Sequence, residues 1–299
     1  MYFERLGHDL GIIVASRKSK LAQVQTDLVM SMIYEKHKLI CEKLLLETKG
    51  DRILDVSLDK IGGKGVFVKE IEIAILEGRA EAAVHSMKDV PYEMPEGFEI
   101  VSMPLREDPR DVYVSMNGIP LEDIPRGARI GTSSKRRSSQ ILNLKPDAVM
   151  VPIRGNVQTR VDKIERENLD GIILAAAGLK RLGMECIITQ YLDASEFVPA
   201  IGQGALGIEA LKTSCYIDIL KSIEHHETRI CVDAERSFMR RLNGGCHSPI
   251  GAYARIQNED MYIQGVYEMN GKFIKKDILG SKYDYINLGK LLGEKILNA

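Results

Sequence analysis

The strongest constraint on the fold is a repeated unit in which a short apolar strand runs into a polar turn and then into a helix. The unit occurs at residues 11–33, 128–144 and 148–164. Strands that alternate with helices in this way form largely parallel sheets in α/β proteins. Such sheets bind ligands at the carboxyl ends of their strands, where the first N–H groups of each helix also attract anions. The sequence therefore predicts an α/β protein whose ligand site lies at these turns.

Length and composition limit the class of protein. At 299 residues the chain is long enough for two domains, or for three small ones. The 41 basic and 42 acidic side chains nearly cancel, so neither nucleic acid nor a membrane surface is an expected partner. No apolar run is as long as a membrane span, and residues 1–11 contain no signal-peptide core. The five cysteines are scattered without a Cys-x-x-Cys pair, which argues against a disulfide framework or a metal site and favours the cytoplasm.

A further strand, predicted at 80–84, ends in the charged turn 85–91, which reads His-Ser-Met-Lys-Asp-Val-Pro. This position would place the carboxylate of Asp89 and the ammonium group of Lys88 at the mouth of a sheet. The alternative is that Asp89 only caps a short helix. The turn alone does not decide between a ligand-binding carboxylate and a capping one.

Basic residues are concentrated in the middle of the chain. Between Arg129 and Arg160 there are seven basic residues and one acidic residue, Asp147. A run of this kind is most often a solvated surface. Here the arginines sit at separate strand-to-helix turns, which suits a small ligand with several carboxylates better than duplex DNA. The arginines at these turns are Arg136, Arg137 and Arg154.

Two stretches of the N-terminal part carry groups that could meet an anion. Arg17 follows the first strand, and Ser19 begins the next helix, where its hydroxyl can bind a ligand or only cap the helix. Residues 49–65 form a long, polar, glycine-rich loop that contains Lys60 and Lys64. The spacing of these lysines and glycines does not match a phosphate-binding loop, so nucleotide binding is not expected there.

A literal G-x-G-x-x-G motif occupies residues 202–207. It follows a proline-containing segment and lacks the strand-turn-helix unit of a dinucleotide site. We interpret it as a tight turn by which the chain returns to the first domain. Upstream of it, the strand 171–175 leads into a short helix that presents Arg181.

After residue 222 the pattern changes to that of a small α+β domain. Helices are predicted at about 228–242 and 285–297, with strands at 250–256, 261–267 and 272–279 between them. An Asn-Gly-Gly turn ends the first of these helices directly before Cys246. A lone cysteine is usually a buried, inert thiol, whereas one on a glycine turn is more accessible.

Taken together, the motifs resemble those of the porphobilinogen deaminase (hydroxymethylbilane synthase) family. The matching stretches lie between Ile12 and Tyr253, at 15–17, 62–70, 84–91, 106–111, 131–137, 154–157, 177–183, 199–207 and 244–251. Several blocks in one order are far more specific than any single block. Lys20 stands where the family usually has proline, and Lys135 where it usually has an aliphatic residue.

The resemblance implies an α/β fold of three domains. Two lobes that resemble periplasmic binding proteins would enclose a cleft, and a small α+β domain would carry the cofactor cysteine. The implied limits are 1–104 with 200–222 for the N-terminal lobe, 105–199 for the central lobe and 223–299 for the C-terminal domain.

The resemblance also implies an activity. A transferase of this family joins four porphobilinogen molecules head to tail, with loss of ammonia, into linear hydroxymethylbilane, a step of heme and tetrapyrrole biosynthesis. It implies a dipyrromethane cofactor that is made from the substrate, held through a thioether to Cys246, and used as a primer. The expected partner is porphobilinogen alone, with the protein a monomer.

The same resemblance assigns residues to roles. Asp89 is expected to be catalytic, because a carboxylate aimed at the pyrrole N–H groups would stabilise the positive charge that develops as ammonia leaves. The expected cofactor-binding residues are Cys246, Lys88, Ser134, Arg136, Arg137, Arg154, Arg160 and Lys64. The expected substrate-binding residues are Arg17, Ser19, Arg154, Arg181 and Lys60. Each pyrrole carries an acetate and a propionate, so these cations would pair with carboxylates that accumulate during elongation.

Two other classes of function stay open on the residues alone. A non-catalytic anion-binding protein of the same fold would explain the arginines but would give Asp89 and the Gly-Gly-Cys turn no role. A hydrolase with Cys246 as nucleophile and His247 as base would need no bound chromophore and would lose activity on thiol alkylation.

Overall fold

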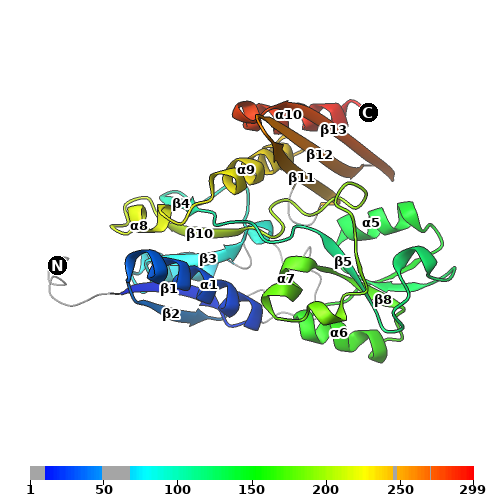
Figure 1. Ribbon diagram of the computed structural model, residues 1–299, viewed down its shortest axis with the longest axis horizontal. Helices are drawn as coiled ribbons and strands as arrows, with labels where there is room; N and C mark the ends of the chain where they lie inside the picture. Colours follow the sequence, from blue (N-terminus) through cyan, green and yellow to red (C-terminus); the bar gives the residue numbers. More distant parts are fainter. Residues whose placement is uncertain (1–10, 49–67, 245–247, 270) are drawn as a thin grey trace.

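The computed structural model describes residues 11–48, 68–244, 248–269 and 271–299 (Figure 1). Two lobes lie side by side, and a C-terminal domain of a sheet and two helices lies above both of them in this view. The predicted fold class, two α/β lobes with a small α+β domain, is confirmed.

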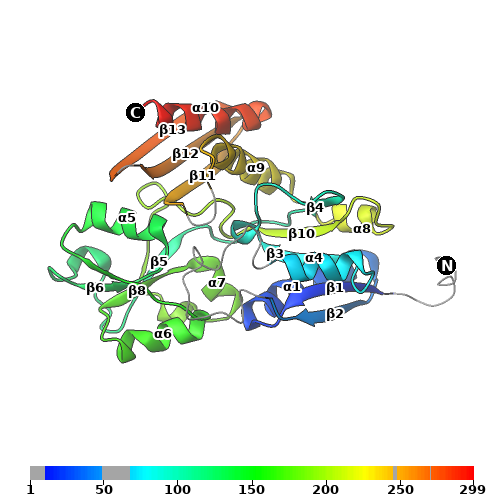
Figure 2. The ribbon, with the colours of Figure 1, turned by 180° about the vertical axis from the view of Figure 1, so that it is seen from behind.

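The first lobe is built on a five-stranded sheet with the order β2-β1-β3-β10-β4. The strands are β1 (Ile12–Arg17), β2 (Cys41–Leu46), β3 (Ala82–Ser86), β4 (Phe98–Ser102) and β10 (Leu206–Leu211). β1, β2 and β3 are parallel, whereas β10 runs antiparallel between β3 and β4. One face packs against α1 (Lys20–His37) and α8 (Ile217–Lys221), and the other packs against α4 (Lys69–Leu76), which Figure 2 shows from behind.

The second lobe repeats this plan with the order β7-β6-β8-β5-β9. The strands are β5 (Asp111–Ser115), β6 (Arg129–Gly131), β7 (Val149–Val151), β8 (Gly171–Ala175) and β9 (Gln190–Tyr191). β6, β7 and β8 are parallel, and β5 runs antiparallel between β8 and β9. α5 (Lys135–Leu144) covers one face, while α6 (Val157–Arg166) and α7 (Ala176–Arg181) cover the other.

The C-terminal domain is an antiparallel three-stranded sheet covered by two helices. Its elements are α9 (His226–Arg241), β11 (Ile250–Gln257), β12 (Asp260–Met269), β13 (Lys272–Ser281) and α10 (Tyr285–Leu297). Phe238 of α9 is wholly buried in its core and lies over Gly265, where a side chain would collide with the ring. Short 3-10 helices complete the fold at η1 (Met87–Asp89), η2 (Leu121–Asp123), η3 (Glu185–Ile187) and η4 (Lys282–Asp284).

The observed elements differ from the prediction mainly at their ends. β1 continues through Arg17, which was predicted to lie in a turn, because it pairs with β2 as far as Leu46. β12 and β13 are ten residues long, since the hairpin pairs over its whole length. The two-residue β9 and the short α8 were not anticipated from the sequence. In the described part of the chain, no helix has both the length and the apolar character needed to cross a membrane.

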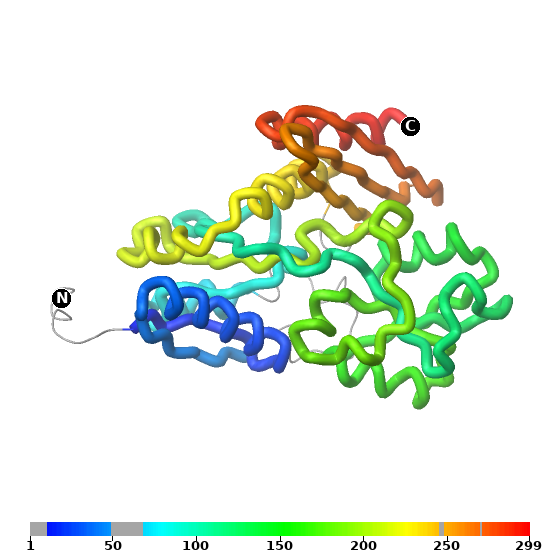
Figure 3. Tube along the Cα trace, in the orientation of Figure 1, coloured from blue at the N-terminus to red at the C-terminus, as the bar shows by residue number. Residues whose placement is uncertain are grey.

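The chain crosses between the lobes twice, and the two crossing segments lie next to each other (Figure 3). The N–H group of Glu107 in the first donates to the carbonyl oxygen of Gly204 in the second at 3.3 Å. Gly204 has a φ of +88°, and a side chain there would collide with the carbonyl oxygen of Glu107. The prediction of a tight turn that leads back to the first lobe is confirmed: residues 201–204 form the turn, and β10 begins at Leu206.

A buried carboxylate of the C-terminal domain holds both crossing segments. Glu235 of α9 is wholly buried and pairs with the guanidinium group of Arg106, with its Oε1 at 2.6 Å from Nη1. Its other oxygen accepts from the N–H group of Gly202 at 2.7 Å, and Oε1 also accepts from Ala254 of β11 at 3.0 Å. One side chain therefore joins both crossings to the sheet above them.

A second group of buried ionisable residues lies within the first lobe. His85 Nε2 lies 2.8 Å from Oε2 of Glu209, and both side chains are nearly or wholly buried. Glu72 of α4 faces this pair. Burial, and then repulsion by Glu209, raise the pKa of Glu72 to about 7, while His85 and Lys69 partly oppose the shift.

We expect Glu72→Gln to stabilise the protein at pH 8 but not near pH 4.5. Between about pH 4.5 and about pH 7 the folded protein keeps the Glu72 proton that the unfolded chain has lost, so stability falls as pH rises through this window. Glutamine removes this loss. Melting temperatures of both proteins at several pH values measure the difference. Glu77→Gln, at the exposed end of the same helix, is the control. An equal gain in the melting temperature of Glu72→Gln at pH 8 and at pH 4.5 would contradict the raised pKa of Glu72.

Candidate active site

The turn that carries Lys88 and Asp89 is fixed by the apolar residues on either side of it. Met87 and Val90 are buried and pack with Met103, Ala205 and Val232. The N–H group of Met87 donates to the carbonyl oxygen of Ala205 at 3.0 Å, which ties η1 to the segment before β10. Because Met87 and Val90 point into this cluster, the half-buried side chains of Lys88 and Asp89 are presented at the end of β3.

Cations of the second lobe lie within electrostatic reach of this turn. The pKa of Lys88 is lowered to about 8, chiefly by burial and further by Arg137 and Arg160, while Asp89 and Asp111 oppose the shift. The pKa of Arg160 is lowered to about 10, again chiefly by burial, with Arg137 and Arg154 adding to the shift and Asp89 opposing it. The structure therefore brings together Lys88, Asp89, Arg137, Arg154 and Arg160, which the sequence placed in three separate segments.

Asp111 binds the two adjacent arginines of α5. It is wholly buried, with Arg136 Nη1 at 2.7 Å from Oδ2 and Arg137 Nη2 at 2.7 Å from Oδ1. Burial alone would raise the pKa of Asp111, but the two guanidinium groups outweigh it and lower the pKa to about 2. Gln203 of the second crossing segment donates to the same carboxylate at 3.1 Å.

Arg136 and Arg137 also donate to backbone carbonyl groups. Arg136 Nη1 donates to Val198 at 2.7 Å, and Arg137 Nη1 donates to Ile173 at 2.9 Å. Both side chains are buried, so they form an internal ion-pair network with Asp111. The sequence signal for Asp111 was weak, because it ends a polar stretch, 106–111, that reads as an exposed linker. Two consecutive arginines at the start of a buried helix, with no acid beside them, were the available sign that such a partner exists.

The remaining predicted residues occupy different positions. Ser19 and Ser134 are N-caps, whose hydroxyl oxygens accept from the N–H groups of Ala22 at 3.3 Å and Arg137 at 3.4 Å. Arg17 is the last residue of β1. Lys60, Lys64 and Cys246 lie outside the described residues.

Arg181 belongs to the crossing region rather than to the cluster around Asp89. Its Nη2 donates to the carbonyl oxygen of Gly204 at 2.7 Å, which links α7 to the second crossing segment. Burial lowers the pKa of Arg181 to about 10, and Glu107 opposes the shift. Glu107 is itself paired with Lys180, the preceding residue, at 2.8 Å.

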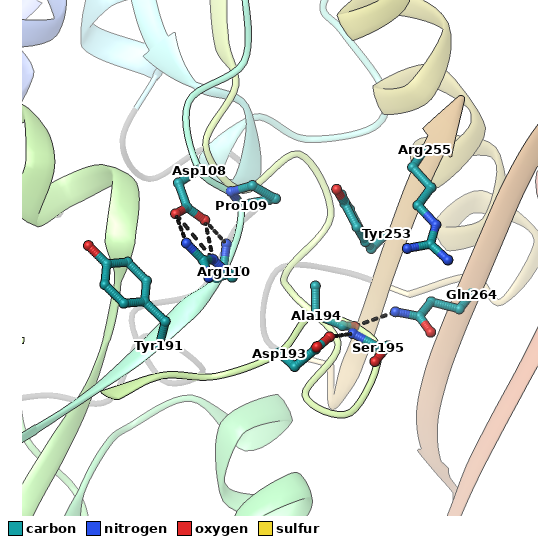
Figure 4. Close-up of a pocket in the computed structure, with 10 residues that line it drawn as sticks. All are labelled: Asp108, Pro109, Arg110, Tyr191, Asp193, Ala194, Ser195, Tyr253, Arg255 and Gln264. Carbon is teal, nitrogen blue, oxygen red and sulfur yellow. Dashed lines mark hydrogen bonds and ion pairs between the residues drawn. The ribbon is translucent and has the colours of Figure 1, made fainter. Parts of the chain in front are cut away.

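A cavity of about 410 Å³ lies elsewhere, between the crossing segments and the C-terminal sheet (Figure 4). Arg110 lies on its wall, where Asp108 holds it at 2.7 Å and its guanidinium group stacks 4.3 Å from the ring of Tyr191. None of the predicted site residues lines it. The residues that do are Asp108, Pro109, Arg110, Tyr191, Asp193, Ala194, Ser195, Tyr253, Arg255 and Gln264. In the described part of the chain, no group of three His, Cys, Asp or Glu residues could hold a metal ion.

The fold and the site define a class of protein: a two-lobed α/β protein with a C-terminal α+β domain and a carboxylate set among cations of both lobes. Two family models identify the family within this class. Residues 12–217 match "Porphobilinogen deaminase, dipyromethane cofactor binding domain", and residues 229–298 match "Porphobilinogen deaminase, C-terminal domain". The chain belongs to the porphobilinogen deaminase family, as its motifs indicated.

Curated relatives agree with the family models. The porphobilinogen deaminase of Clostridium botulinum (strain Langeland) is 58% identical over 288 residues, which cover 96% of this chain and 99% of the relative. That of Clostridium perfringens (strain ATCC 13124) is 60% identical over 286 residues, covering 96% and 98%. Among solved structures, the methionine-binding protein MetQ overlaps 72% of this chain and 90% of its own, with a TM-score of 0.46 and 10% identity.

We expect Asp111→Asn to destabilise the protein by about 3 to 5 kcal/mol, because two buried guanidinium groups would lose their shared counter-charge. Urea unfolding followed by circular dichroism measures the loss. The matched control is Asp147→Asn, which breaks the exposed pair with Arg126 and should cost less than about 1 kcal/mol. Similar losses in the two variants would refute the structural role of Asp111.

Proposed function

We propose that this chain condenses four porphobilinogen molecules head to tail, with release of ammonia, into linear hydroxymethylbilane. The observation that carries the proposal is the position of Asp89: one carboxylate at the end of β3, within electrostatic reach of Lys88 and Arg160 in a group of cations from both lobes. An anionic pyrrole needs cations for its side chains and a carboxylate for its ring. This arrangement offers both.

The residues present fit a dipyrromethane. Each ring of that group carries an acetate and a propionate, so the group needs an excess of positive charge. Lys88, Arg154 and Arg160 supply it, and burial has lowered the pKa of Lys88 and Arg160, so carboxylates bound here would relieve an existing cost. When bound, the dipyrromethane would supply the pyrrole carbon on which the chain is extended. The family model that matches residues 12–217 is itself that of a dipyrromethane-binding domain.

Asp89 is the proposed catalytic residue. The turn that carries it has buried residues on both sides, so the backbone at Asp89 is fixed before substrate arrives. The carboxylate would stabilise the positive charge that develops on a pyrrole ring as ammonia leaves, and its oxygen could hold the pyrrole proton. A preorganised charge of this kind needs no rearrangement during the reaction.

The cations are proposed to divide between cofactor and substrate. Lys88, Ser134, Arg136, Arg137, Arg154, Arg160 and Lys64 are assigned to the cofactor, which Cys246 would hold through a thioether. Arg17, Ser19, Arg154, Arg181 and Lys60 are assigned to the substrate. The internal contacts of Arg136 and Arg137 with Asp111 suggest that these two act mainly by orienting the turn at Ser134, the N-cap of their helix.

We further propose the domain limits, the cellular location and the oligomeric state of the protein. The N-terminal lobe comprises 1–104 and 200–222, the central lobe 105–199, and the C-terminal domain 223–299, limits that fall between β4 and β5, before β10 and before α9. The protein acts as a cytoplasmic monomer.

The intact mass of the native protein should exceed the mass calculated from its sequence by two linked pyrrole units. The excess should be absent from Cys246→Ser, because serine offers no thiol for the thioether. Mass spectrometry under non-reducing conditions measures both proteins, and Cys186→Ser, which changes an exposed thiol, is the control. A bare polypeptide that gains no mass on incubation with porphobilinogen would be a binding protein and would refute the proposal.

Asp89→Ala should lower kcat by about a hundredfold or more while leaving the protein folded, because it removes the charge that stabilises the developing cation. Ammonia release from porphobilinogen and the melting temperature measure the two properties. Asp123→Ala is a matched control, since Asp123 is also the last residue of a 3-10 helix but is exposed. Normal turnover by Asp89→Ala would exclude this residue from catalysis.

A further inference from the structure

The C-terminal domain contacts the turn of Asp89 directly through Arg236 of α9. Arg236 Nη1 donates to the carbonyl oxygen of Val90 at 3.1 Å, and Nη2 donates to that of Pro91 at 2.6 Å. Val90 and Pro91 are the two residues that follow Asp89. Arg236 is 9% exposed, so its two bonds are made in a largely dry environment, where a charged donor binds a carbonyl group strongly.

Two apolar contacts reinforce this connection. Val232 lies one turn before Arg236 on the same face of α9, is wholly buried, and packs with Met87 and Val90 on either side of Asp89. Tyr92, three residues after Asp89, packs against the core of the C-terminal domain. The segment from Met87 to Tyr92 is therefore held by α9 and its domain before and after the carboxylate.

The same helix, α9, also contacts both crossing segments, and its C-terminal end leads toward Cys246. Glu235, next to Arg236, binds Arg106 and Gly202 of the two crossing segments. α9 ends at Arg241, and Cys246 follows five residues later. One helix is thus joined to the turn of Asp89, to both crossings and to the segment that leads to Cys246.

We propose that Arg236 is a positioning residue that sets the place of Asp89. Through it, α9 keeps the catalytic carboxylate in a fixed relation to the C-terminal domain. This inference rests on the proposed role of Asp89. A misplacement of about 1 Å can cost about a hundredfold in rate, so a guanidinium fork on the backbone beside the carboxylate has a kinetic role that a surface ion pair lacks.

The test compares Arg236→Gln and Arg236→Lys with wild type as loaded enzymes. Arg236→Gln should keep the cofactor mass and should lower kcat about 10- to 100-fold, with KM changed less than about threefold, because the cations that bind substrate carboxylates are untouched. Arg236→Lys, which retains the charge but not the fork, should show a smaller loss of kcat. Arg241→Gln, on the same helix but paired with Glu294 at its exposed side, is the control and should keep wild-type kcat.

The outcomes separate this inference from the proposed function. Wild-type kcat in loaded Arg236→Gln would overturn the positioning role. A kcat that falls only in proportion to the folded fraction of the variant would overturn it as well. So would an equal fall of kcat in the control Arg241→Gln. Failure of both Arg236 variants to fold would assign the residue to stability alone and would overturn it too. A wild-type protein without cofactor mass or turnover would instead refute the proposed function, and this inference with it.

Discussion

Two buried carboxylates hold the three parts of this molecule in place. Asp111 begins β5 and gathers Arg136, Arg137 and Gln203, while Glu235 gathers Arg106 and the N–H group of Gly202. Both acids are wholly buried, and each bonds at least one residue of a crossing segment. A buried charge persists only when it is fully paired, so each carboxylate requires its donors to stay in one arrangement. The relative position of lobes and C-terminal domain depends on this requirement.

The same requirement divides the basic residues into two groups. Arg136 and Arg137 share Asp111, so much of their charge is balanced inside the second lobe. Lys88 and Arg160 lie within electrostatic reach of Asp89, and the pKa of each is lowered chiefly by burial; Arg154 adds to the shift of Arg160. A basic stretch that looks uniform in the sequence therefore serves both the interior and the site.

Local pattern predicted the elements well, but long-range partners could not be predicted from it. Alternation of strands and helices predicted the α/β class, and the resemblance to the family added the two lobes. The position of Asp89 at the end of β3 was predicted from the strand before it, whereas its role stays a prediction. The sequence could not show that β10 inserts between β3 and β4, because these strands pair across more than a hundred residues. Nor could it show that Asp111 and Arg236 are buried, since each lies in a charged stretch typical of a surface. For Ser19 the capping alternative is what the structure shows, and Ser134 is an N-cap as well; a ligand role for either stays a prediction.

The contacts described above join the turn of Asp89 to the C-terminal domain and hold the second lobe together separately, so the molecule consists of two bodies. Asp89 is tied to α9 by Arg236 and Val232, whereas Arg154 and Arg160 belong to the second lobe, whose interior Asp111 secures. The two bodies meet at the crossing segments, beside the cavity of about 410 Å³. They also meet at α1 and α7, where Gly178 lies next to the side chain of Leu21. If each added pyrrole must find its carboxylates paired, the cations have to shift relative to a carboxylate that stays at the point of reaction. The proposed role of Asp89 fits this demand, because Arg236 and Val232 tie its turn to α9, whereas Arg154 and Arg160 belong to the other lobe.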